Sequence, residues 1–230
     1  MRLRISSRFL PGILAIAGLT LAGGEALATS LASTNLVDLL RNSTSILKGE
    51  VTSVTDGVDP SGLPYTEVTL EVGQTLRGVE TGTYSFRQFG LLAPRLSPDG
   101  TRLAMPAPDG LPKYEVGEKV LLFLSRPASQ TGLRSTYALG NGKFTLGPGR
   151  AENALGNQGL FTNVSLDASL TTNSDIRMLQ TEIGAVNDGD FVSLVDRAVQ
   201  GGWVENGLMW RTNEGRRSGG STGTATVTVK

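Results

Sequence analysis

The sequence predicts a mainly β protein, with one short helix before the strands and one or two helices after them. Residues 65–72 alternate apolar and polar side chains, as a strand with one buried face does. Residues 120–124 form an unbroken apolar run, Val-Leu-Leu-Phe-Leu, which is too short for a helix. Such a run suits a central strand of a barrel or sandwich, buried on both faces. Glycine, proline, asparagine and aspartate separate these runs, as turns between strands require.

The first 28 residues have the layout of a secretory signal peptide. A basic stretch over residues 1–8 precedes an apolar stretch over residues 9–22, and Ala26-Leu27-Ala28 has the small residues of a cleavage site. The apolar stretch is short for a membrane span, although an uncleaved anchor is the alternative. We therefore expect cleavage near Ala28, a secreted or periplasmic bacterial protein, and no membrane attachment after cleavage.

Composition excludes several kinds of chemistry. The chain has no cysteine and no histidine, so Ser-His and Cys-His nucleophile pairs and imidazole-ligated metal sites are impossible. No disulfide can hold the fold together. Loss of Arg2, Arg4, Arg8 and Glu25 with the leader leaves 18 of the 21 basic and 20 of the 21 acidic residues. A nucleic-acid partner would need a concentrated basic face, so we do not expect one.

The N-terminal part is expected to hold one helix and most of the strands. Residues 33–35, Ser-Thr-Asn, can cap a short helix that carries Leu36, Leu39 and Leu40 on one face. Residues 90–112 contain five prolines and predict a long loop. The expected strands, from their β-branched content and alternation, are residues 46–54, 65–72, 74–78, 83–89 and 120–124.

In the C-terminal part, residues 136–139 and 143–146 predict a hairpin around Gly-Asn-Gly. A helix is expected over residues 191–199, with Asp190 as its N-cap and an apolar stripe that packs against the barrel. A further strand is expected at residues 160–164, a weaker helix at 176–183, and an alternative strand at 224–229. The predicted domains are a signal peptide (1–28), a β domain (29–170), a helical segment (171–200) and a Gly/Ser/Thr-rich, disordered tail (201–230).

The order of these elements resembles the netrin-like module shared with tissue inhibitors of metalloproteinases, and a group of uncharacterised exported bacterial proteins. The resemblance lies in the strand with Lys48-Gly49-Glu50-Val51, the strand that ends in Leu76-Arg77-Gly78, and the Gly117-Glu118 turn into residues 120–124. It covers roughly residues 33–147 and implies an OB-like five-stranded Greek-key barrel. The inhibitors of that family chelate the protease metal through an N-terminal cysteine. This chain has no cysteine, so that mechanism does not carry over.

Aromatic side chains are the candidates for binding. Tyr65, Tyr84 and Phe89 come from neighbouring expected strands, and an OB-like face can present rings to an oligosaccharide or a peptide. Trp203 and Trp210 follow the last helix and could form an exposed patch for a partner. The alternative is that Phe86 lies in the core, Tyr84 packs near a barrel end and the two tryptophans close the core, since aromatic residues are usually buried.

Catalytic, metal and cofactor sites are not expected. Asn187, Asp188 and Asp190 offer oxygen ligands but lack the spacing of an EF-hand, and a capped helix start explains them. Glu67 and Glu71 share a strand face at about 13 Å, beyond the separation of glycosidase carboxylates. We therefore expect a secreted, non-catalytic binding or interaction module whose partner is a secreted protein or peptidase. The alternative is a cysteine-independent inhibitor of an extracellular (metallo)protease.

Overall fold

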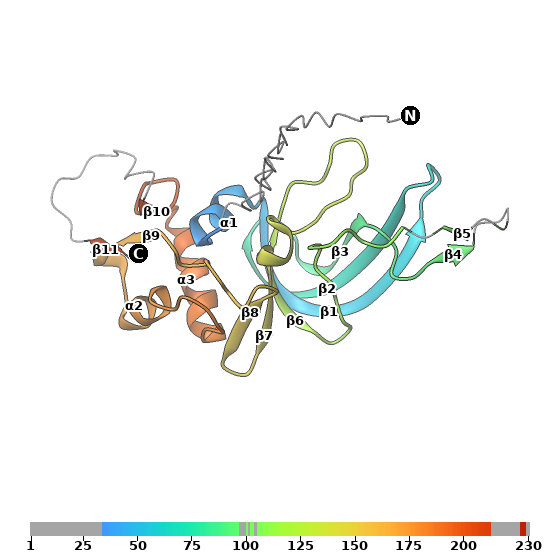
Figure 1. Cartoon of the computed structure of the whole chain (residues 1–230). Helices are drawn as coiled ribbons and strands as arrows, with labels where there is room; N and C mark the ends of the chain where they lie inside the picture. Colours follow the sequence, from blue (N-terminus) through green and yellow to red (C-terminus); the bar gives the residue numbers. More distant parts are fainter. Residues whose placement is uncertain (1–33, 97–99, 101, 104, 213–225, 229–230) are drawn as a thin grey trace, which may run out of the picture. The chain divides into compact units, whose positions relative to one another are not determined.

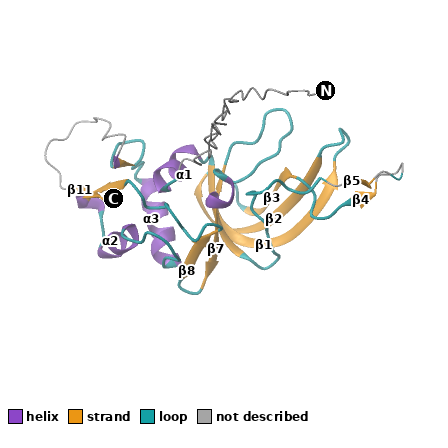
Figure 2. Cartoon of the chain, viewed as in Figure 1, coloured by secondary structure: helices purple, strands orange, loops and turns teal. Residues whose placement is uncertain are grey.

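The computed structural model describes residues 34–96, 100, 102–103, 105–212 and 226–228 (Figure 1). The expected signal peptide lies outside the described residues, and so do residues 213–225 and 229–230 of the expected tail. The described chain is mainly β with three α-helices, as the sequence predicts (Figure 2).

One short helix precedes the long strands, and the other two α-helices lie in the last third of the chain. The helices are α1 (Leu36–Asn42), α2 (Asn173–Leu179) and α3 (Asp188–Gln200), with 3-10 turns η1 (Leu139–Gly142) and η2 (Ala168–Leu170). The strands are β1 (Ser45–Val58), β2 (Pro64–Arg77), β3 (Gly82–Phe89), β4 (Arg95–Leu96), β5 (Arg102–Leu103), β6 (Lys119–Leu124), β7 (Lys143–Gly147), β8 (Arg150–Asn153), β9 (Val164–Asp167), β10 (Met209–Arg211) and β11 (Thr226–Thr228).

The main sheet has six antiparallel strands in the order β3-β2-β1-β6-β7-β8. A second sheet has the order β10-β9-β11, and β4 pairs with β5. Strands β3 and β8 are the edges of the main sheet, and within the described residues it is an open sheet, not a closed barrel. The mainly β class is therefore confirmed, with six strands in the main sheet in place of the expected five.

Strand β6 is the centre of the hydrophobic core. Val120, Leu122 and Leu124 point into a core enclosed by β1, β2 and β3, whereas Leu121 and Phe123 point into a larger core beneath the helices. All five side chains are fully buried. The prediction of a strand buried on both faces is confirmed, because helices cover one face of the sheet and its own curled strands enclose the other.

Two of the predicted N-terminal features are confirmed, and the hairpin predicted at the start of the C-terminal part is wrong. Asn35 caps α1 in a capping box with Asp38. Strand β2 covers both predicted segments and runs without a break through Gly73. The predicted hairpin around residues 140–142 does not form: β7 pairs instead with β6 and β8. Ala138 and Leu139 both have a φ of 55°, which belongs to a left-handed turn and interrupts a strand.

The C-terminal elements differ from the predictions mainly at their ends. Strand β9 begins at Val164, where the expected strand ends, and α2 lies at 173–179, earlier than expected. Helix α3 is capped by Asn187, whose Oδ1 accepts from the N–H of Asp190 at 2.9 Å, so Asp190 is not the cap. Residues 201–212 are not a disordered tail. They form a turn and β10, and β11 occupies part of the segment given as an alternative strand.

Candidate functional site

The two tryptophans proposed for a partner patch are core residues. Trp203 is 5% exposed and Trp210 is 9% exposed. Trp203 belongs to the core beneath the helices, and the guanidinium of Arg197 lies 5.4 Å from its ring centroid. The structure therefore favours burial for both side chains, because the turn after α3 folds back over the core.

Tyr84 faces the enclosed core and is held there. Its ring stacks on Phe86 with centroids 6.2 Å apart, and its hydroxyl accepts a hydrogen bond from Arg134 Nη1 at 2.6 Å. Because side chains alternate along a strand, Tyr84 and Phe89 point to opposite faces of β3. The structure thus separates Tyr84 from the other two candidate rings.

Tyr65 and Phe89 are brought together on the outward face as cross-strand neighbours of β2 and β3. Tyr65 lies across Gly57, where a Cβ would come within 2.6 Å of the tyrosine hydroxyl. The guanidinium of Arg87 covers the ring at 4.1 Å from its centroid. Tyr65 therefore covers a glycine in the neighbouring strand, a packing role that aromatic residues often have in sheets.

A cleft of about 1110 Å³ opens across the middle of β1 and β2, the start of β6 and the β7–β8 turn. Its polar lining comes from Lys48, Glu50, Thr52, Glu71, Gln74, Glu118, Lys119, Thr145 and Asp188. Glycines line much of the rest, and a Cβ at Gly147 would meet no atom within 4 Å. At Gly73 the nearest atom would be 3.8 Å away. We call this hollow the cleft.

The course of β1 explains why the cleft forms here. Its pairing with β2 shifts register at three places, between Ile46 and Leu47, between Lys48 and Gly49, and between Val51 and Ser53, as bulges do. Gly49 is required at the second shift, since a Cβ there would lie 2.5 Å from the carbonyl oxygen of Glu71. The bulges bend the strand, and the glycines leave space where side chains would otherwise stand.

The charges in the cleft are mixed. Glu50 lies opposite Glu71 on one side and opposite Lys119 on the other. Glu71 accepts a hydrogen bond from the hydroxyl of Thr83 at 3.1 Å. Among the described residues, no three side chains of the metal-ligating types gather closely enough to hold an ion. Such a lining suits recognition of a polar ligand by hydrogen bonds and single charges.

A second hollow of about 540 Å³ adjoins the cleft and shares Thr145 and Gly147 with it. A half-buried polar cluster lies at this border. Lys143 Nζ donates to Glu118 Oε1 at 2.5 Å, and Thr145 Oγ1 donates to the same oxygen at 2.6 Å. The Glu118 side chain is only 13% exposed. Glu118 lies in the turn before residues 120–124, whose other residues Glu115, Val116, Gly117 and Lys119 are exposed. Its own side chain is half-buried because β7 brings Lys143 against it.

Tyr114 lies beside this cluster, and sequence patterns did not single it out. Its hydroxyl is buried and, among the described atoms, has no hydrogen-bond partner. Burial raises the pKa of Tyr114, and the nearby charge of Glu118 adds to the effect. The ring packs edge-on against Phe86 at 5.8 Å and carries Lys143 Nζ at 5.0 Å from its centroid.

Arg134 is the most highly connected polar side chain of the described structure. It is 6% exposed and donates five hydrogen bonds of 2.6 to 3.0 Å. The acceptors are Glu80, Tyr84, Thr44, Ser45 and the carbonyl of Ser125. Burial raises the pKa of Glu80, but hydrogen bonds from Ser45 and Arg134 outweigh it and leave the pKa lowered. Because every donor direction of Arg134 is occupied by protein atoms, we assign this cluster a structural role.

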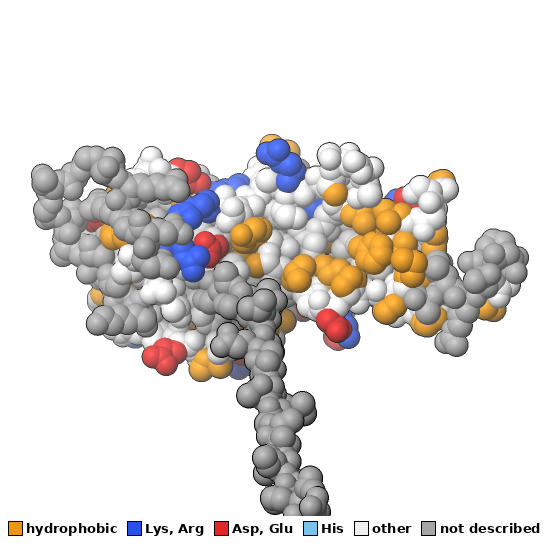
Figure 3. All heavy atoms as spheres, turned by 45° about the horizontal axis from the view of Figure 1, so that its top comes forward, with side chains coloured by type: hydrophobic (Ala, Val, Ile, Leu, Met, Phe, Trp, Pro, Cys, Tyr) orange, Lys and Arg blue, Asp and Glu red, His pale blue; other side chains and the backbone are white. Residues whose placement is uncertain are grey.

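An apolar surface adds to these features. Figure 3 shows hydrophobic side chains gathered on part of one face. The exposed large apolar side chains near the end of β1 and in the segment after β3 are Val58, Leu92, Leu96 and Met105. Leu92 lies beside β1, because its N–H donates to Asp56 Oδ2 at 2.8 Å.

A comparison with protein-family models, with characterised proteins and with solved structures finds no match to this chain. Within the part of the chain that the structure describes, no α-helix combines the length and the apolar content that a membrane crossing requires.

Proposed function

We propose that this chain is a secreted, non-catalytic binding module that holds its ligand in the cleft. The observation that carries the proposal is the open, glycine-lined hollow of about 1110 Å³ with polar side chains around it. Its volume is of the size that ligand pockets have in proteins. The absence of histidine and cysteine from the sequence removes the cysteine nucleophile and the commonest general base, which supports binding over catalysis.

We further propose that the β domain is OB-like and related to the netrin-like module. Strand β1 pairs with both β2 and β6, as the first strand of an OB barrel pairs with its second and fourth. The chain after β6 also reaches toward β3. Thr136 forms a bridge with Leu124, and the N–H of Arg134 donates to the carbonyl of Arg87 at 2.7 Å. These links support a sheet that curls toward closure at one end.

The cleft is tested by filling it. Gly73→Trp places a ring where the structure has open space, and tryptophan is compatible with a strand. Thr55→Trp, at an exposed position of β1 that does not line the cleft, is the matched control. Both variants and the native protein are screened on arrays of short synthetic peptides and of oligosaccharides.

We expect a ligand that the native protein and Thr55→Trp bind equally. Gly73→Trp should bind that ligand at least about tenfold more weakly, a loss of about 1.4 kcal/mol. Equal affinity for Gly73→Trp and the native protein would show that the cleft is not the binding site.

Inhibition of an extracellular protease without a cysteine is the second candidate function. One observation favours it, namely the exposed loop over residues 125–133 between β6 and β7, which protease clefts could admit. Its test is whether the purified protein slows hydrolysis of a peptide substrate by a secreted protease. Full activity of serine and metalloproteases at a large excess of the protein would count against it.

A further inference from the structure

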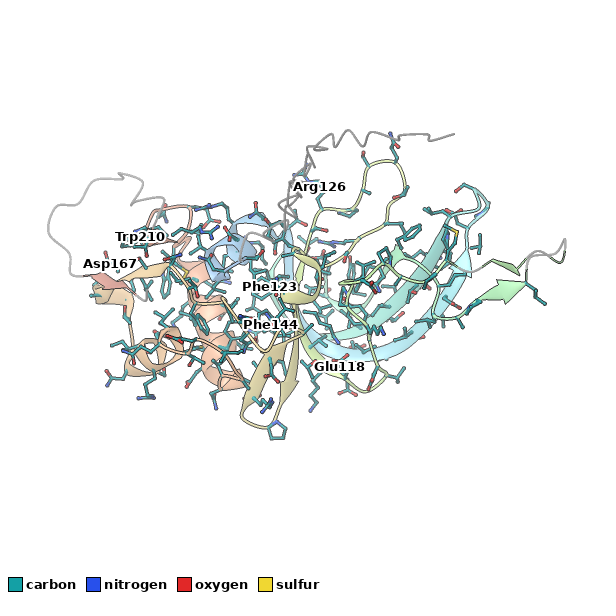
Figure 4. The ribbon with its side chains drawn as sticks, in the orientation of Figure 1. Glu118, Phe123, Arg126, Phe144, Asp167 and Trp210 are labelled. Carbon is teal, nitrogen blue, oxygen red and sulfur yellow. The ribbon has the colours of Figure 1, made fainter. Side chains whose placement is uncertain are left out.

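The loop over residues 125–133 stands out from the strands that it joins (Figures 1 and 4). Residues 126–132 are all exposed, in sequence Arg-Pro-Ala-Ser-Gln-Thr-Gly. Arg126 is the only charged residue among them. The other side chains are small or polar, so the loop presents one guanidinium on a slender support.

Backbone hydrogen bonds hold the two arms of the loop together. The N–H of Ser125 donates to the carbonyl of Ser135 at 2.9 Å, and the N–H of Ala128 donates to the carbonyl of Leu133 at 2.8 Å. Arg126 and Pro127 lie between these two closures. The proline ring fixes φ at its own position, so the backbone around Arg126 has little freedom.

The base of the loop is fixed by the Arg134 cluster. Arg134 directly follows the loop, and its Nε donates to the carbonyl of Ser125, the first residue of the loop, at 2.7 Å. The same guanidinium is bound to Glu80 on the other side of the cluster. A loop that is ordered before binding loses less conformational entropy when it docks, which favours affinity.

The Arg126 side chain is exposed and available to bind a partner protein. Among the described residues, no carboxylate pairs with it and no hydrogen bond holds it, whereas the neighbouring Arg134 is saturated. A planar, exposed guanidinium is best matched by a carboxylate that can accept two parallel hydrogen bonds. The partner should therefore offer an acidic group at the bottom of a narrow pocket.

We propose that this loop is an inhibitory docking loop that places Arg126 in the acidic specificity pocket of a serine protease that cleaves after arginine. The inference rests on the second candidate function and names the protease class. Trypsin-like proteases bind arginine in such a pocket. The bond after Arg126 is a tertiary amide, and its leaving nitrogen belongs to the Pro127 ring, which crowds that nitrogen and fixes its φ. We therefore expect the loop to bind without being cut.

The test uses trypsin and a chromogenic arginyl substrate. The native protein should inhibit competitively, and Arg126→Ala should weaken inhibition at least about 100-fold, as the loss of a central interface arginine can. Arg126→Lys should retain most of it, because the pocket also accepts a lysine cation. Arg177→Ala, which removes an exposed arginine of α2, is the matched control and should inhibit like the native protein.

Three results would overturn the inference. The first is no inhibition at about 100 μM native protein, a concentration far above the Kd of specific interfaces. The others are unchanged inhibition by Arg126→Ala and cleavage of the chain after Arg126. Thermolysin, a metalloprotease, distinguishes the second candidate function from the proposed role of Arg126. Inhibition of thermolysin alone would preserve the second candidate function and refute the role of Arg126. The Gly73→Trp variant should inhibit trypsin normally, so the cleft and the loop are tested independently.

Discussion

Replacement of Arg134 by methionine should lower the free energy of unfolding by about 3 to 5 kcal/mol. Methionine keeps an unbranched apolar stem but removes all five hydrogen-bond donors. It leaves the carboxylate of Glu80, which is 14% exposed, without its cationic partner. It also leaves the buried hydroxyl of Ser45 without a donor.

The expected magnitude follows from burial of the pair. Removal of one partner of a buried ion pair costs about 3 to 5 kcal/mol, because an uncompensated charge remains. Solvent screening reduces this little, since the Arg134 side chain is 6% exposed. The separate hydrogen bonds share one side chain, so their energies are not added. A loss of about 3 to 5 kcal/mol is a large part of the usual stability of a domain, about 5 to 15 kcal/mol.

Urea denaturation followed by tryptophan fluorescence measures this loss, because Trp203 and Trp210 are both buried in the folded chain. Arg126→Met is the matched control: the same chemical change in the adjoining loop, at an exposed and unpaired position, should shift stability by less than about 0.5 kcal/mol. A double-mutant cycle with Glu80→Gln should give a coupling energy of about 1 to 3 kcal/mol. A loss below about 1 kcal/mol for Arg134→Met would refute the structural role of the Arg134 cluster, because such a value is typical of an exposed ion pair.

The pH dependence gives an independent check of the same cluster. The pKa of Glu80 is lower in the folded chain than in the unfolded one. Its stabilising contribution is therefore complete above the unfolded pKa and is lost as pH falls through the folded pKa. Glu80→Gln should remove this part of the acid sensitivity, which urea titrations between pH 3 and pH 7 measure. An unchanged pH profile for Glu80→Gln would contradict the assignment.

Three further substitutions test the cores and the border of the cleft. Glu118→Gln should destabilise the folded chain by about 1 to 3 kcal/mol, because the Lys143 side chain would remain 12% exposed beside a neutral amide. Urea titration measures the loss, and a change below about 0.5 kcal/mol would mean that solvent, not Lys143, surrounds the Glu118 carboxylate. Tyr114→Phe should leave the stability of the folded chain unchanged or raise it, since it removes a buried hydroxyl without a hydrogen-bond partner among the described atoms. The melting temperature should be equal or higher, and a marked fall would mean that the hydroxyl has a partner. Leu122→Asp should prevent folding, because it buries an unpaired charge in a fully buried position; a soluble variant that melts cooperatively would place Leu122 outside the core.

Local pattern was sufficient for five of the six strands of the main sheet, β1, β2, β3, β6 and β7. Residues 65–72 and 120–124 could be predicted because alternation and unbroken apolar runs report directly how many faces of a strand are buried. The cap at Asn35 was also predictable, since a helix start depends on side chains within one turn. The strand expected at residues 136–139 failed for the opposite reason. Left-handed backbone at Ala138 and Leu139 is imposed by packing, and neither residue type signals it.

The site was less predictable than the fold. Aromatic content suggested Tyr84, Trp203 and Trp210 as binding residues, but burial of each side chain depends on segments far away in the sequence. The cleft could not be foreseen, because it arises from register shifts between β1 and β2 and from glycines whose neighbours are contributed by other strands. The Arg126 loop likewise depends on Arg134, which reaches Glu80 across 54 positions of the sequence.

What this chain's sequence determined by itself is its β character, the cap of its first helix and the imidazole and thiol chemistry that it cannot perform, because each depends on residue type and on near neighbours. What only the tertiary structure decided is which polar groups are buried and which are free. Two arginines eight positions apart show the difference: Arg134 is enclosed by five acceptors, whereas Arg126 is exposed. Solvation of a charge is set by the surrounding chain, and this surrounding exists only after folding.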